Sequence, residues 1–122
     1  MAKRILVVDD DPDIRQVLQD RLDSYGYVVE TAIDGQEALD ALKLRSYDGM
    51  LLDIMMPKVN GLEVLQESRK HRPLMPVVMI TASRVKETTI QALEDGAQAF
   101  LLKPFDIVRL KTVVDRWFGT AS

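Results

Sequence analysis

Four apolar runs of this 122-residue sequence are each followed by a polar side chain that could take part in chemistry. The polar residues are Asp9 with Asp10, Asp53, Thr81, and Lys103 followed by Pro104. Carboxylates held within a few ångströms of one another repel, so such a cluster favours a bridging cation. Mg²⁺ takes oxygen ligands and typically uses one or two carboxylates plus a phosphate, while an ammonium and a hydroxyl suit phosphoryl oxygens. If these residues meet, the set predicts phosphoryl chemistry on Asp53.

Taken one at a time, these residues have ordinary structural interpretations. Asp11 is explained by its place before Pro12 as a helix N-cap, and Asp53 alone could begin an Asx-turn. A single Thr81 or Lys103 after a strand is ordinary surface. Their joint occurrence after four apolar runs is what favours a site over a set of unrelated residues.

Composition narrows the chemistry that such a site can use. The chain has no cysteine, which excludes thiolate metal sites and a cysteine nucleophile, and its single histidine, His71, excludes any site that needs two imidazoles. His71 lies in a basic run, where a cation is favourable at a helix C-terminus, and it is assigned no catalytic role. The chemistry must therefore depend on carboxylates, hydroxyls and lysines.

Length, charge and hydropathy limit the organisation of the chain. At roughly 100 to 200 residues per domain, the 122 residues predict a single domain over 1–122. The net charge of −3 does not fit a nucleic-acid binder. No stretch approaches the ~18 apolar residues that a membrane span requires, and the apolar run after Arg4 is too short for a signal peptide. We therefore expect a cytoplasmic protein without a membrane segment.

Alternating strand and helix patterns run through the whole sequence. Strands are predicted at 5–8, 27–31, 50–53, 77–80 and 99–102, and helices at 12–25, 36–45, 61–72, 85–94 and from the cap Asp106 to Phe118. The run 5–8 is apolar throughout, which is typical of a strand covered on both faces. The pattern predicts an α/β domain with a doubly wound, five-stranded parallel sheet and helices on both faces. Ligands bind such sheets beyond the carboxyl ends of the strands, so the polar residues are expected to converge at one edge.

Two of the predicted helices differ in how strongly the sequence marks them. The first helix places Ile14, Val17, Leu18, Leu22 and Tyr25 at helical intervals. The helix at 85–94 is the weakest of the five, because three consecutive residues in it are β-branched. A marginal helix of this kind can shift with little loss of packing.

Four segments of the chain, in this order, resemble the motifs of the response-regulator receiver domain. They are Val7-Val8-Asp9-Asp10-Asp11, residues 51–61 (LLDIMMPKVNG), Ile80-Thr81-Ala82, and Leu102-Lys103-Pro104-Phe105. The resemblance to this CheY-like superfamily covers essentially the whole chain. It implies a flavodoxin-like (βα)5 three-layer sandwich with the strand order 2-1-3-4-5.

The resemblance also implies a role for each residue of the acidic site. Asp53 matches the aspartate that accepts a phosphoryl group. Asp10, Asp53 and the backbone carbonyl of Met55 match the direct ligands of Mg²⁺, for which Mn²⁺ is an expected substitute. Asp9 matches a residue that holds the metal through water.

Residues around the acidic site match the phosphoryl-binding and switch positions of the family. Thr81, with Ala82 beside it, and Lys103 match residues that contact the phosphoryl group, and Phe100 matches the aromatic that turns inward on activation. The Lys103–Pro104 peptide bond matches one that is cis in the family. The implied output surface consists of the helix at 85–94, the fifth strand and the last helix.

The partners implied by the resemblance are those of a switch rather than of an enzyme. A sensor histidine kinase or a phosphotransfer protein supplies the phosphoryl group, and a downstream effector protein or effector domain reads the result. The domain itself is expected to catalyse only its own phosphorylation and dephosphorylation. No membrane and no direct contact with nucleic acid are expected, and a weak homodimer is allowed.

Three other functions stay open on the residues alone. A metal-dependent phosphatase with an aspartyl nucleophile would use similar residue types, but such enzymes usually need a second aspartate at the position of Met55. An FMN carrier of the same fold is disfavoured, because three consecutive aspartates would repel the cofactor phosphate. A phosphorylation-independent interaction module would be marked by loss of the acidic pair, Asp53 or Lys103, and all are present.

Overall fold

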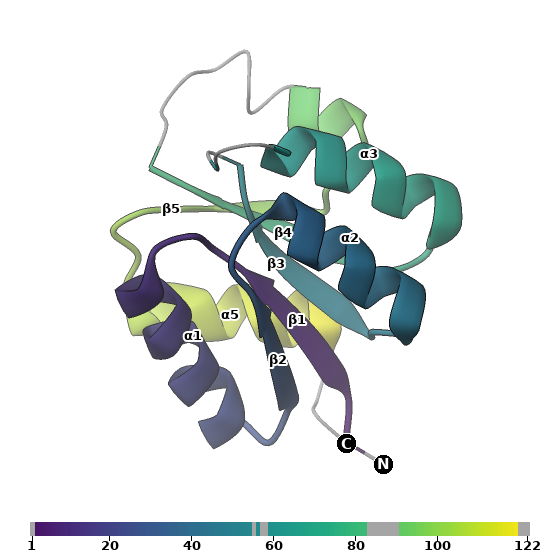
Figure 1. The fold of residues 1–122 in the computed structure, drawn as a ribbon. Coiled ribbons are helices and arrows are strands. Elements are labelled where there is room, and N and C mark those ends of the chain that lie inside the picture. The colour runs from purple at the N-terminus through teal and green to yellow at the C-terminus, as the bar shows by residue number, and fades with distance from the viewer. Residues whose placement is uncertain (1, 55, 57–58, 83–90, 120–122) are drawn as a thin grey trace.

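The computed structural model describes residues 2–54, 56, 59–82 and 91–119, and Figure 1 shows the arrangement of its elements. In chain order these are β1 (Arg4–Val8), α1 (Pro12–Ser24), β2 (Val28–Ala32), α2 (Gly35–Leu44), β3 (Gly49–Asp53), α3 (Gly61–His71), β4 (Val77–Thr81), β5 (Ala99–Leu102) and α5 (Ile107–Phe118). The predicted strands are confirmed to within one residue at each end. Of the helix predicted at 85–94, residues 91–94 are helical and the remainder lies outside the described residues.

All five strands are parallel and lie in the order β2-β1-β3-β4-β5, which confirms the predicted doubly wound sheet. The register of the strands determines how far along the sheet each polar residue lies. Val8 pairs with Leu52, so Asp9 lies level with Asp53 at the carboxyl ends of β1 and β3. Thr81 closes β4 and pairs with the last residue of β5, so Lys103 follows at the same edge.

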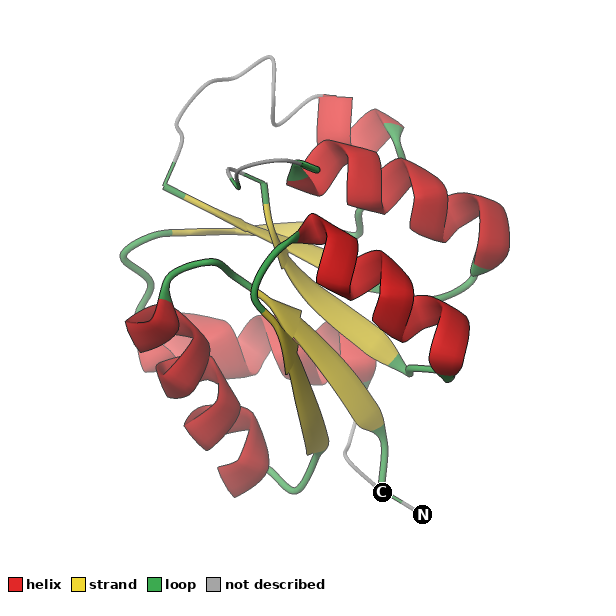
Figure 2. Cartoon of the chain, in the orientation of Figure 1, coloured by secondary structure: helices red, strands yellow, loops and turns green. Residues whose placement is uncertain are grey.

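The sheet is covered on both faces, with α1 and α5 on one side and α2 and α3 on the other (Figure 2). Leu6 and Val8 point into the core under α2 and α3, while Ile5 and Val7 point into the core under α1 and α5. All four side chains are fully buried, which explains why β1 is apolar throughout. No helix among the described residues is both long and apolar enough to cross a bilayer.

The start of α1 agrees with the sequence prediction, and one of its apolar side chains is exposed. Asp11 is the N-cap, and its carboxylate accepts hydrogen bonds from the backbone N–H groups of Asp13 and Ile14. Val17, one of the apolar residues at helical intervals, is 44% exposed. It lies about 100° around the helix axis from the fully buried Leu18, at the flank of the apolar stripe.

Gly61, the first residue of α3, packs directly on the backbone that carries Asp53. A Cβ atom at position 61 would lie 2.2 Å from the Asp53 carbonyl oxygen and 2.6 Å from Ile54 Cα. The Gly61 N–H also donates to the Ile54 carbonyl at 2.9 Å. The absence of a side chain at Gly61 therefore lets α3 approach the carboxyl end of β3.

A polar cluster ties β1, β2 and α2 together at some distance from the acidic residues. Glu30 accepts hydrogen bonds from Arg4, from Arg45 at 3.0 Å and from the Tyr47 hydroxyl at 2.9 Å. Burial alone would raise the pKa of Glu30, but the hydrogen bonds from Tyr47 and Arg4 and the charge of Arg45 outweigh it and lower that pKa. Burial and the Glu30 carboxylate raise the pKa of Tyr47 to about 12, so the hydroxyl stays a donor at neutral pH.

We expect Gly61→Ala to lower the free energy of unfolding by about 1–3 kcal/mol, because the added methyl group would force the Asp53 backbone and α3 apart. Urea unfolding followed by circular dichroism measures the effect. Glu63→Ala, an exposed position in the same helix turn, is the matched control and should change stability by about 0.5 kcal/mol or less. Equal stabilities for the two variants would contradict the close approach of Gly61.

We expect Glu30→Gln to lower the free energy of unfolding at pH 7 by about 1 kcal/mol or less, because the cluster is partly exposed. A carboxyl whose folded pKa is lowered stabilises the protein above its unfolded pKa and loses that effect as pH falls through the folded pKa. The difference from wild type should therefore shrink as pH falls below the ordinary Glu value of 4.5. Urea unfolding at a series of pH values tests this; a difference independent of pH would contradict it.

Candidate functional site

Three carboxylates from two strands meet at the carboxyl edge of the sheet. One oxygen from each of Asp9, Asp10 and Asp53 can be chosen so that all lie within 4.8 Å of one another. Asp9 is 0% exposed and Asp53 is 3% exposed, whereas Asp10 lies at the surface. Burial of two like charges so close together requires compensation from a cation.

Lys103 provides part of that compensation from the end of β5. Its Nζ atom lies 2.9 Å from Asp9 Oδ2 and donates a hydrogen bond to Asp53 Oδ2 at 3.2 Å. The contact with Asp9 is an ion pair at short distance, and its angles are poorer than those of an aligned hydrogen bond. Burial by itself lowers the pKa of Lys103, but Asp9 and Asp53 together outweigh it and raise that pKa, so the ammonium form is stabilised.

The net negative charge of this group favours the binding of a divalent cation. Among these four side chains, three carboxylates against the ammonium of Lys103 give a net charge of −2. Carboxylate oxygens are the ligands that Mg²⁺ prefers, and one of the three, Asp10, is open to solvent, where a hydrated ion can enter. The residues present therefore fit a magnesium site. Met55, the other predicted ligand, lies outside the described residues.

Asp9 is held at every polar atom. Its N–H donates to the Ala32 carbonyl at 3.2 Å, and its carbonyl accepts a hydrogen bond from Arg15 Nη1 at 2.8 Å. Its Oδ1 accepts from the Asp11 N–H at 2.9 Å, while Oδ2 faces Lys103. The side chain and its backbone therefore form a fixed support for the loop that carries Asp10.

The other predicted site residues lie around this group. Thr81 is 1% exposed at the end of β4, and Ala82 comes after it at the surface. Phe100 is half-buried on β5 and packs against the core under α2 and α3. The Lys103–Pro104 peptide bond is cis.

Two residues that shape the site were not assigned to it from the sequence. Gly61 was predicted only to begin a helix; a residue of low helix propensity at that position was the available signal for a close approach. Arg15 was not singled out. The available signal was a cation near the N-terminus of a helix, where the helix dipole disfavours it unless a specific partner compensates.

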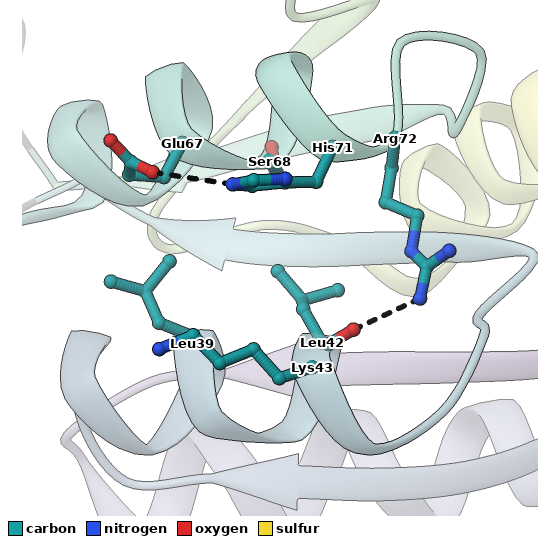
Figure 3. Close-up of a pocket in the computed structure, with 7 residues that line it drawn as sticks. All are labelled: Leu39, Leu42, Lys43, Glu67, Ser68, His71 and Arg72. Atoms are coloured by element: carbon teal, nitrogen blue, oxygen red, sulfur yellow. Dashed lines mark hydrogen bonds and ion pairs between the residues drawn. The ribbon is translucent and has the colours of Figure 1, made fainter.

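A groove of about 420 Å³ lies between α2 and α3, away from the predicted site residues (Figure 3). Seven residues line it: Leu39, Leu42, Lys43, Glu67, Ser68, His71 and Arg72. Arg72 closes one end by donating to the Leu42 carbonyl at 3.0 Å, and His71 lies 3.7 Å from Glu67. None of the three site carboxylates lines this groove, so it is separate from the acidic group at the sheet edge.

Comparison with known proteins agrees with the family resemblance of the sequence motifs. Residues 5–115 match the family of the response regulator receiver domain. The "Probable transcriptional regulator ycf27" of Cyanophora paradoxa is 46% identical over 103 residues, which cover 84% of this chain and 43% of that protein. The chain spans less than half the length of this relative and of the other curated relatives compared with it.

Two solved structures illustrate the likeness in space. Chemotaxis protein CheY4 of Vibrio cholerae matches with a TM-score of 0.91 and 32% identity, over 96% of this chain and 99% of that one. The receiver domain of sensor histidine kinase PA1611 from Pseudomonas aeruginosa PAO1 matches with a TM-score of 0.88 and 29% identity, over 98% and 99% of the two chains. That structure has a magnesium ion coordinated in its active-site cleft.

The family match runs from β1 into α5 and includes all three carboxylates of the acidic pocket. The strand order is the one that the resemblance implied. The chain therefore belongs to the family of response regulator receiver domains, the CheY-like domains of two-component signal transduction.

Proposed function

We propose that Asp53 accepts a phosphoryl group from a sensor histidine kinase or a phosphotransfer protein and that the modified domain then binds a downstream effector. The observation that supports this most directly is the position of the buried Asp53 carboxylate, between two other carboxylates and within reach of Lys103. A nucleophilic carboxylate with a cation at hydrogen-bond distance is suited to phosphoryl transfer, because the cation offsets the charge that the transferred group brings.

In the proposed step an Asp53 carboxylate oxygen forms a bond to phosphorus as the phosphorus–nitrogen bond of a phosphohistidine donor breaks. The electron pair of that bond stays on the donor's imidazole nitrogen. Lys103 is placed to follow the new phosphoryl oxygens, since it already contacts Asp53, and Thr81 at the end of β4 is the hydroxyl nearest in the register. Ala82, next to it, would offer its backbone N–H.

Magnesium would supply charge neutralisation at the transferred group. Asp10 and Asp53 are the side chains proposed to hold it directly, together with the Met55 carbonyl, and Asp9 would act through a bound water. The contacts of Asp9 with Lys103 and with the Asp11 N–H support this indirect role, because they hold its carboxylate in place at the side of the site. Mn²⁺ is the proposed substitute.

The output surface proposed for the switch consists of residues 85–94, β5 and α5. Phe100 on β5 is half-buried, which leaves it room to change its packing when Thr81 moves. Three large apolar side chains are exposed in the described part of this surface: Leu93 by 48%, Leu102 by 43% and Val108 by 77%. An effector protein or effector domain that covers them would gain burial of apolar surface.

The organisation proposed for residues 1–122 is a single receiver domain that acts in the cytoplasm. A histidine kinase is implied by the family, whereas the identity of the effector is a matter for experiment. A weak homodimer is included in the proposal, because the exposed apolar residues of β5 and α5 could also serve a second copy.

We expect the purified protein to be phosphorylated by acetyl phosphate in the presence of Mg²⁺, and Asp53→Ala to abolish the labelling. Intact-protein mass spectrometry detects the added phosphoryl group. Asp20→Asn, which removes an exposed carboxylate on α1, is the matched control and should be labelled like wild type. Equal labelling of Asp53→Ala and wild type would refute the assigned acceptor.

We expect beryllofluoride, a mimic of the phosphoryl group, to shift the NMR amide signals of Phe100, Thr81 and residues 85–94. The reason is that Thr81 and Lys103 would both follow the new charge, and Phe100 lies on the neighbouring strand β5, two residues before the partner of Thr81. Wild type and Asp53→Asn are compared in heteronuclear spectra, and Asp53→Asn should show no shifts. Changes confined to the loop after Asp53 would contradict the switch.

A further inference from the structure

Asp10 differs from the other two carboxylates of the site in how it is held. Its side chain makes no hydrogen bond or ion pair with any of the described residues, whereas Asp9 and Asp53 both contact Lys103. Because no described residue holds the Asp10 side chain, its direction depends on the backbone on either side of it. The elements that fix this backbone therefore decide where a ligand oxygen of the proposed cation site lies.

Hydrogen bonds hold both peptide units that flank Asp10. The carbonyl of the Asp9–Asp10 peptide accepts from Arg15 Nη1 at 2.8 Å. The N–H of the Asp10–Asp11 peptide donates to Asp9 Oδ1 at 2.9 Å. Of the described side chains, Arg15 supplies the hydrogen bond to the peptide that precedes Asp10, and it does so from a separate element, α1.

Arg15 is itself well anchored for this task. It lies in the first turns of α1, where its backbone N–H donates to the Asp11 carbonyl at 3.0 Å, and its side chain is half-buried. The planar guanidinium is pre-organised, so it loses less freedom than an ammonium when it forms a hydrogen bond. The helix dipole disfavours a cation at this end of a helix. The contact with Asp9 is therefore the interaction that stabilises Arg15 at this position.

We propose that Arg15 is a positioning residue of the cation site, which orients the Asp9–Asp10 peptide so that an Asp10 oxygen faces Asp53. The inference rests on the proposed function, in which Asp10 and Asp53 hold Mg²⁺. In this proposal α1 carries none of the three carboxylates but helps to position them through Arg15.

Two effects of removing Arg15 have opposite signs, which makes the inference testable. The guanidinium carries a positive charge beside an anionic pocket, so loss of its charge alone would strengthen Mg²⁺ binding. Loss of its hydrogen bond would free the Asp9–Asp10 peptide and weaken Mg²⁺ binding. Partners that orient a metal ligand typically contribute about tenfold or more to affinity, which exceeds a screened charge effect at the surface.

We expect Arg15→Met to raise the Kd for Mg²⁺ about tenfold, measured by NMR titration of the full chain with MgCl₂. Arg21→Met removes the same charge from an exposed position farther along α1 and is the matched control, with a change of less than about twofold. Amide spectra of the apo proteins check that each variant is folded. If Arg15→Met does not fold, Arg15→Ala, with the best helix former, makes the same test.

An unchanged or lower Kd for the Arg15 variant would overturn the inference. The ratio of its Kd to that of wild type should stay the same or rise at about 1 M KCl, where the Debye length of about 3 Å screens the opposing charge effect; a ratio that falls to one there overturns the inference as well. Asp10→Asn and Asp53→Asn test the proposed function separately. If neither changes the Kd, the cation site itself is wrong; if both weaken binding and Arg15→Met does not, only the role of Arg15 is wrong.

Discussion

Repulsion among the carboxylates at the end of β1 and β3 is the constraint on which the site depends. Asp9 and Asp53 are buried, and two like charges at such a distance are tolerated only when a cation compensates them. Lys103 does so in part and leaves a local charge of −2 with Asp10 included. The same charge imbalance favours a divalent cation. Lys103 is shared between two carboxylates, so in the proposed function its ammonium is available to pair with a new phosphoryl oxygen.

Much of the fold was predictable because each element carries its own local signal. The buried β1 is apolar throughout, and Asp11, Asp34, Asn60 and Asp106 cap the helices that come after them. The convergence of Asp9, Asp53 and Lys103 was predictable from the rule for parallel sheets and from the motifs, since each residue ends a strand. The exposure of Val17 was not predictable in this way: helical spacing defines a stripe but not its edge, and how far a neighbouring element covers the flank depends on tertiary packing.

The sequence did not reveal contacts that side chains or helices make with backbone atoms, because no residue pattern marks such contacts. Gly61 matters because of the backbone of Asp53 beneath it, and Arg15 matters because of a carbonyl oxygen six residues earlier. Neither partner is a side chain, so no pairing of residue types marks these contacts. The cluster of Tyr47, Glu30 and the arginines around it was hidden for another reason. It forms only in the register that β2 has against β1, which the sequence does not state.

Two arginines near the end of α3, Arg69 and Arg72, affect how α2 and α3 can move relative to each other. Arg72 donates to the last carbonyls of α2, at Leu42 and Arg45, and Arg69 donates to three carbonyls of the turn that leads into β4. These hydrogen bonds join α2, α3 and the turn after α3. In the proposed function, a shift of α3 relative to α2 would have to break them, so this pair of helices would move together or stay in place.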